Sequence, residues 1–116
     1  MSPTQRTLQE CKRRGYTAQV VERRIPRSFI TLDLFGVIDI VALTPDGILG
    51  IQATSGANHR SRVAKSLDEP RMHSWLAAGG LFAVWSWAKR GARGKRKTWT
   101  LRTEALGAAQ AGRGKA

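Results

Sequence analysis

The pattern of apolar and polar positions divides the first third of the chain into a helix and an extended segment. Residues 2–14 predict a helix, because Ser2 can cap its start and Gly15 suits its end. Residues 16–24 alternate enough to predict a first strand. Residues 27–34 fit either an extension of that strand or a loop beside an active site.

The clearest pattern is a β-hairpin over residues 37–54, in which "VIDIVAL" and "ILGIQAT" flank the turn sequence "TPDG". With a two-residue loop, position 39 pairs with position 52, so Asp39 and Gln52 are expected to lie side by side on one face. A bulge at Gly47 would shift the register by one residue and separate these two side chains.

The remaining pattern predicts two more helices and two more strands. The helices are expected at residues 59–67 and 70–78, and the strands at 81–88 and 97–103. The order predicts a single α/β domain over residues 1–103, with an α-β-β-β-α-β core, a mixed central sheet and an extra C-terminal strand. Residues 104–116 are expected to form a flexible basic tail.

Charge adds a class of partner to this picture. The 116 residues include 20 Lys and Arg against 8 Asp and Glu, which gives a formal net charge of +12. A polyanion would relieve the resulting self-repulsion, and nucleic acid is the commonest such partner. Ribosomal and membrane-surface proteins share this balance. Cys11 is the single cysteine, which excludes an internal disulfide and a zinc site built on thiolates.

The chain shows no apolar run long enough to span a membrane and no secretory signal at its start. A cytoplasmic protein with no membrane partner and no small-molecule cofactor is therefore expected.

Asp39 is unusual because it interrupts an apolar strand. Buried charges are generally paired or bound to a metal, although a carboxylate at a sheet edge can also accept backbone hydrogen bonds. The amide of Gln52 would ordinarily be a satisfied buried group. Side by side, a carboxylate and an amide carbonyl are hard oxygen ligands of the kind that Mg²⁺ prefers. Asp33 would join them if residues 31–36 fold back toward Asp39.

The segments "GVIDIVAL", "TPDG" and "ILGIQATS", preceded by a helix and a strand and followed by basic residues, resemble the PD-(D/E)xK nuclease superfamily. The likeness covers most of residues 5–88 and is strongest to small Holliday-junction-resolvase-like and phage-type nucleases. It implies a restriction-endonuclease-like core, DNA binding and phosphodiester hydrolysis with Mg²⁺, for which Mn²⁺ substitutes. In this resemblance Asp39 matches the metal-binding aspartate and Gln52 the second acidic position.

Three further residues enter through the resemblance. The family's lysine position is Thr54 here, so Lys65 on the following helix is the candidate replacement, against the alternative of a solvated basic residue. Glu10 matches a glutamate that family members often carry on the first helix. The alternative for Glu10 is a surface ion pair with Arg6 and Arg14, one helical turn away on either side.

The segment "KRGARGKRK" at residues 89–97 has six basic residues among nine, which suits phosphate contacts better than a core. Together with the helix at 59–67 it gives the candidate nucleic-acid-binding residues His59, Arg60, Arg62, Lys89, Arg90, Arg93, Lys95, Arg96 and Lys97. A domain of this size covers little DNA, so a homodimer is expected. Two alternatives stay open: an inactive nucleic-acid-binding protein with the nuclease fold, and a ribosome-associated basic protein.

Overall fold

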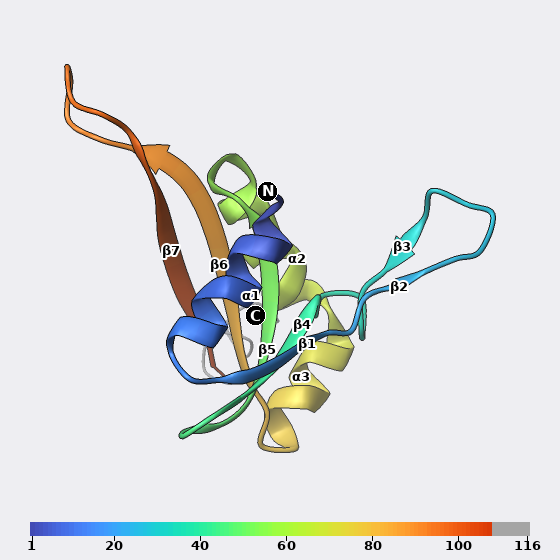
Figure 1. Ribbon diagram of the computed structural model, residues 1–116. Coiled ribbons are helices and arrows are strands. Elements are labelled where there is room, and N and C mark those ends of the chain that lie inside the picture. The colour runs from blue at the N-terminus through green and yellow to red at the C-terminus, as the bar shows by residue number, and fades with distance from the viewer. Residues whose placement is uncertain (108–116) are drawn as a thin grey trace.

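A mixed five-stranded sheet in the order β1-β4-β5-β6-β7 forms the centre of the computed structural model, which describes residues 1–107 (Figure 1). Strands β5 and β6 are parallel, and the other neighbours in the sheet are antiparallel. The five strands are β1 (Thr17–Val20), β4 (Ile40–Thr44), β5 (Gly47–Ser55), β6 (Leu81–Arg90) and β7 (Thr98–Leu106). The predicted α/β class with a mixed sheet is confirmed.

Helix α1 (Pro3–Arg13) begins and ends where the sequence predicts. The Ser2 hydroxyl accepts a hydrogen bond from the Gln5 amide at 3.1 Å, and the Gln5 side chain accepts one from the Ser2 amide at 2.8 Å. This reciprocal pair satisfies two amides that the first turn leaves open. Gly15 follows the helix with a φ of +81°, a conformation that glycine adopts without strain.

The sheet has a core on each face, because successive side chains of a strand point to opposite sides. Cys11 of α1 packs in one cluster with Ile51 and Trp85. Helices α2 (His59–Asp68) and α3 (Pro70–Ala77) cover the other face, where Met72 packs in a cluster with Val84. A short 3₁₀ turn (Gly56–Asn58) connects β5 to α2. Each face of the sheet is therefore protected by helices.

The register of the predicted hairpin is confirmed. Leu43 lies opposite Ile48, and Ile40 lies opposite Ile51. The same alignment continued by one position brings Asp39 and Gln52 together, and their side chains are joined by a hydrogen bond of 2.8 Å. The hairpin thus positions the two residues that the sequence singled out.

The predicted first strand over 16–24 is divided in the structure. Its first part is β1, after which the chain leaves the central sheet and forms β2 (Arg23–Arg24), which pairs with β3 (Thr31–Leu32) in a separate two-stranded ribbon. Residues 23–32, named the arm below, project from the body of the molecule (Figure 1). The ambiguous segment 27–34 therefore supplies the tip of the arm, strand β3 and the turn after it.

The predicted boundary between the domain and its tail, at residue 104, lies within the last strand. Strand β7 runs to Leu106, which is buried opposite Phe82 and packs in the core under α2 and α3. Residues 108–116 of the predicted tail lie outside the described residues. Within residues 1–107, no helix is long and apolar enough to cross a membrane.

Candidate active site

Asp39 is buried immediately before β4, with 4% of its surface exposed. Its Oδ2 atom accepts hydrogen bonds from Gln52 Nε2 at 2.8 Å and from the amide of Ala53 at 2.9 Å. The amide of Asp39 itself donates to the carbonyl of Ile51 at 2.9 Å. The carboxylate is therefore fixed from both its backbone and its side chain.

A tight turn brings Asp33 back to Asp39, which is the condition under which the sequence placed Asp33 in the site. The amide of Leu34 donates to Ile38 O at 2.8 Å, and the amide of Gly36 donates to Asp33 O at 3.0 Å. Phe35 and Gly36 have φ values of +53° and +78°. A non-glycine residue in this left-handed region is strained, and such strain is commonly found at functional sites.

Glu22 is the third carboxylate of the site, and sequence reasoning missed it. Ligand oxygens of Glu22, Asp33 and Asp39 all lie within 4.8 Å of one another. Glu22 reaches this position because β1 pairs with β4 and the amide of Val21 donates to Asp39 O at 2.8 Å. The only sign of Glu22 in the sequence is its position near the end of a predicted strand. The alternating pattern does not show which strand pairs with that strand, so it could not place Glu22 beside Asp39.

Burial and neighbouring negative charge raise the pKa values of Asp39 and Glu22. The pKa of Asp39 rises from 3.8 to about 8, chiefly because the group is buried and also because it shares a hydrogen bond with Asp33 and lies in the field of its charge. Burial and the charge of Asp33 raise the pKa of Glu22 as well. A divalent cation would remove the repulsion that raises both pKa values.

Gln52 supplies an independent indication of a ligand. The side chain is only 3% exposed, and its Oε1 atom accepts no hydrogen bond from any described residue. Buried carbonyl oxygens without a partner are rare and require an explanation. The amide to which Oε1 belongs contacts Asp39 through its Nε2 atom, so a cation held by the carboxylates would lie close to the Gln52 amide. The carboxylates of Glu22, Asp33 and Asp39 could therefore hold a metal ion.

The raised pKa of Asp39 predicts how stability depends on pH in EDTA. Between about 4 and about 8 the folded protein holds a proton that the unfolded chain has released, so the free energy of unfolding falls as pH rises through this range. Asp39→Asn should flatten this dependence and raise stability at pH 8 by roughly 1–3 kcal/mol. Urea unfolding from pH 5 to 8 measures both. Asp46→Asn, at the exposed β4–β5 turn, is the matched control. If Asp39→Asn keeps the pH dependence of wild type, the raised pKa does not belong to Asp39.

Lys65 lies at the edge of the acidic cluster. It lines a groove of about 250 Å³ together with Thr31, Leu32, Asp33, Gly36 and Arg71. Arg71 is committed to Glu69, with Nη2 to Oε1 at 2.7 Å, and this pairing lowers the pKa of Glu69 to about 2. Lys65 is exposed and has no ion pair within residues 1–107. Of the two basic side chains that line this groove, Lys65 is therefore the one without an ion pair among the described residues.

Glu10 does not join the cluster. It pairs with Arg13 at 2.5 Å and with Arg14 at 2.8 Å, and these contacts lower the pKa of Glu10 to about 2. Helix α1 covers the face of the sheet that carries Ile51, whereas the next residue, Gln52, points to the opposite face. Glu10 therefore belongs to a surface ion pair. The additional carboxylate of the site is Glu22, and not Glu10 as the sequence had suggested.

His59 is buried, with 1% of its surface exposed, so the predicted phosphate contact by this residue is wrong. Its Nδ1 atom lies 2.6 Å from Ser86 Oγ, and its Nε2 atom lies 2.9 Å from Glu104 Oε1. Both ring nitrogens are therefore used within the fold, where they link the start of α2 to β6 and β7.

His59→Ala is expected to lower the free energy of unfolding by about 2–4 kcal/mol, because it removes both hydrogen bonds and leaves a cavity. Affinity for nucleic acid should change little when measured below the unfolding transition. Arg60, the exposed neighbour of His59, serves as the control. Arg60→Ala should leave the free energy of unfolding unchanged and weaken the binding of nucleic acid. Urea unfolding and fluorescence anisotropy separate the two effects, and a stable His59→Ala protein that binds poorly would restore the phosphate-contact interpretation.

The other basic candidates lie on the surface. Arg60 and residues 89–97 are exposed, and Arg62 is partly buried on α2. The loop between β6 and β7 extends away from the body, on the opposite side from the arm (Figure 1). Lys89 lies over the ring of Trp99, with its Nζ atom 5.6 Å from the ring centre. These positions leave the basic loop accessible to a large partner.

A comparison of the chain with protein-family models, with curated proteins and with solved structures found no match. The site therefore has to be interpreted from its own geometry and chemistry.

Proposed function

We propose that this protein is a metal-dependent endonuclease that binds DNA and hydrolyses its phosphodiester bonds. The observation that carries the proposal is the cluster of Glu22, Asp33 and Asp39 carboxylates. Asp39 of this cluster is hydrogen-bonded to the buried amide of Gln52, whose Oε1 atom has no partner among the described residues. Four oxygen donors of this kind match the preferences of Mg²⁺ and Mn²⁺. An exposed surface rich in Lys and Arg supplies the attraction for a polyanionic substrate.

The residues divide into two roles. Asp39, Asp33, Glu22 and Gln52 would hold the cation, which when bound polarises a phosphate oxygen and lowers the pKa of a water ligand. Lys65, across the groove from Asp33, orients the phosphate and stabilises the charge that develops on it. Thr54, at the position of the family's lysine, is 6% exposed and carries no charge, so the cationic contribution has to come from α2.

The order of elements supports a restriction-endonuclease-like core within this proposal. Helix α1 precedes three antiparallel strands, and the helices α2 and α3 lead to β6, which is parallel to β5. Asp39 lies immediately before β4 and Gln52 lies within β5, at the positions that match the metal-binding pair of the resembled family. Small domains of this type gain a second binding surface as a symmetric homodimer, which we include in the proposal.

The test is a cleavage assay with the full chain on labelled four-way, flap, single-stranded and linear DNA, in Mg²⁺, Mn²⁺ or EDTA. Cleavage that requires the metal, and a preference for branched DNA, are expected. The absence of cleavage on every substrate in both metals would refute hydrolysis.

A second function is supported by Thr54: a nucleic-acid-binding protein that keeps the fold without hydrolysis. In that case DNA binding would persist in EDTA, and Mg²⁺ would neither promote cleavage nor raise the unfolding temperature. RNA preference in the same binding assay would instead favour a ribosome-associated role.

A further inference from the structure

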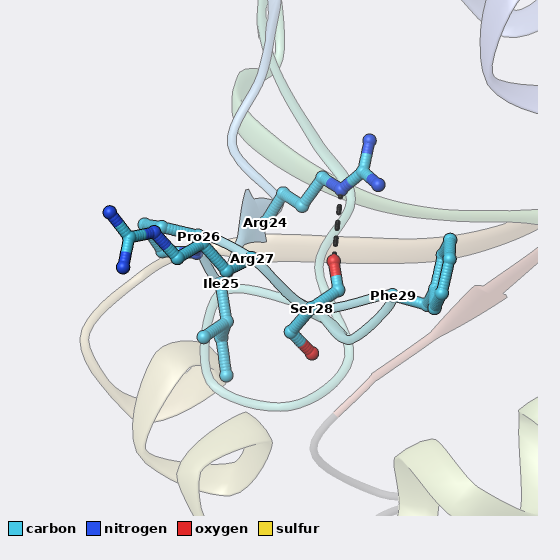
Figure 2. A pocket seen from close by; sticks show the side chains of 6 residues that line it. All are labelled: Arg24, Ile25, Pro26, Arg27, Ser28 and Phe29. Atoms are coloured by element: carbon cyan, nitrogen blue, oxygen red, sulfur yellow. Dashed lines mark hydrogen bonds between the residues drawn. The ribbon is translucent and has the colours of Figure 1, made fainter.

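The arm (residues 23–32) carries an exposed aromatic ring at its tip. Its two short strands pair only with each other in the sheets that the structure describes. Phe29 is 98% exposed and the adjacent Ile30 is 56% exposed. Figure 2 shows the Phe29 ring extending from the tip, away from Ile25 and Arg27. Leu32, on the same arm, is 43% exposed. A group of exposed apolar side chains on one projecting segment indicates a contact with a partner.

The charge of the arm indicates what kind of partner this is. Arg23, Arg24 and Arg27 are exposed, and residues 23–32 contain no acidic residue. None of these arginines has an ion pair within residues 1–107. Arg24 Nε donates to Ser28 O at 3.2 Å, which fixes the tip and leaves the rest of the guanidinium free (Figure 2). An aromatic ring among unpaired arginines is suited to stacked bases and phosphates.

The arm is built directly onto the candidate active site. Glu22 precedes β2, and Asp33 follows β3, and both residues belong to the acidic cluster. A strand of nucleic acid at this cluster therefore lies at the foot of the arm. The three steps from Glu22 to Ile25, after which the chain turns back, span about 10 Å at roughly 3.3 Å per residue. This reach exceeds the depth of a DNA groove, which is about 8 Å.

We propose that the arm binds the nucleic-acid substrate, with Phe29 stacked on an unpaired or unstacked base and the arginines on the flanking phosphates. The inference rests on the proposed function only in taking nucleic acid as the ligand of the acidic cluster. Insertion of a side chain into a continuous duplex requires base unstacking, whereas a branch point or a single strand offers free base faces. Phe29 therefore gives the protein its preference for branched or single-stranded DNA.

The test compares wild type with Phe29→Ala and Phe29→Trp for binding to four-way, single-stranded and linear DNA in EDTA. Phe29→Ala should weaken binding to branched and single-stranded DNA by about 5–100-fold and leave the linear duplex nearly unchanged. Phe29→Trp should retain wild-type affinity. A 2-aminopurine base at the junction should change its fluorescence with wild type and not with Phe29→Ala. Because Phe29 is exposed, the unfolding temperature should not change.

Ile48→Ala is the matched control, since Ile48 is 50% exposed near the start of β5. The turn between β4 and β5 lies away from the arm (Figure 1). The inference fails if Phe29→Ala binds every DNA as wild type does, or if it loses affinity equally for all of them. Binding of anionic phospholipid vesicles that depends on Phe29, with unchanged DNA affinity, would also overturn it. Since the assay needs no cleavage, Phe29-dependent binding without any hydrolysis would support the arm and refute only the nuclease proposal.

Discussion

Asp39→Asn is expected to abolish metal-dependent cleavage while DNA binding is retained. The substitution keeps the size of the side chain and its hydrogen-bond acceptor for the Ala53 amide, but it removes the central charge among Glu22, Asp33 and Gln52. The rate should fall by at least about 10²–10³-fold, because a charged group that acts on the transition state is lost. Initial rates on the preferred substrate in Mg²⁺ measure this loss, and anisotropy in EDTA measures binding.

Asp46→Asn is the matched control for this variant, because Asp46 is exposed at the β4–β5 turn and lies outside the acidic cluster. It should cleave as wild type does. A thermal-shift titration adds a readout that does not depend on hydrolysis. Mg²⁺ should raise the unfolding temperature of wild type and of Asp46→Asn, but not that of Asp39→Asn. Full cleavage by Asp39→Asn would place the active site elsewhere.

Lys65→Ala is expected to reduce the cleavage rate by about 10²–10³-fold, while the affinity for DNA falls by less than about fivefold. The reason is the position of Lys65 in the groove beside Asp33, where Arg71 is occupied by Glu69. Lys65 is exposed on α2, so stability should not change. Single-turnover rates at saturating protein separate the chemical step from binding.

Lys65→Arg tests the chemistry more finely, since it keeps the charge and should restore part of the rate. Lys12→Ala, an exposed lysine near the end of α1 on the other face of the sheet, should have little effect on the single-turnover rate. If Lys65→Ala and Lys12→Ala reduce cleavage equally, Lys65 belongs to the general positive field of the protein and has no specific role in hydrolysis.

Much of the fold could be predicted from local sequence because local interactions decide it. Ser2 and Gln5 form their capping pair within one turn of α1, and the "TPDG" turn sets the register that joins Asp39 to Gln52. Once that register is fixed, the period of two along each strand decides which side chains are neighbours. For this reason the central pair of the candidate site could be identified before the structure was known.

Only the tertiary structure decided the rest, because it depends on contacts between segments that are distant in the chain. Glu22 enters the site since β1 pairs with β4, and His59 is buried since Ser86 and Glu104 come to it from β6 and β7. Neither contact leaves a periodic signal around the residue itself. The arm likewise emerges because the chain departs from the sheet after Val20, where the alternating pattern alone favours one continuous strand. Sequence therefore determined the elements and the Asp39–Gln52 pair, and long-range strand pairing determined which other residues surround them.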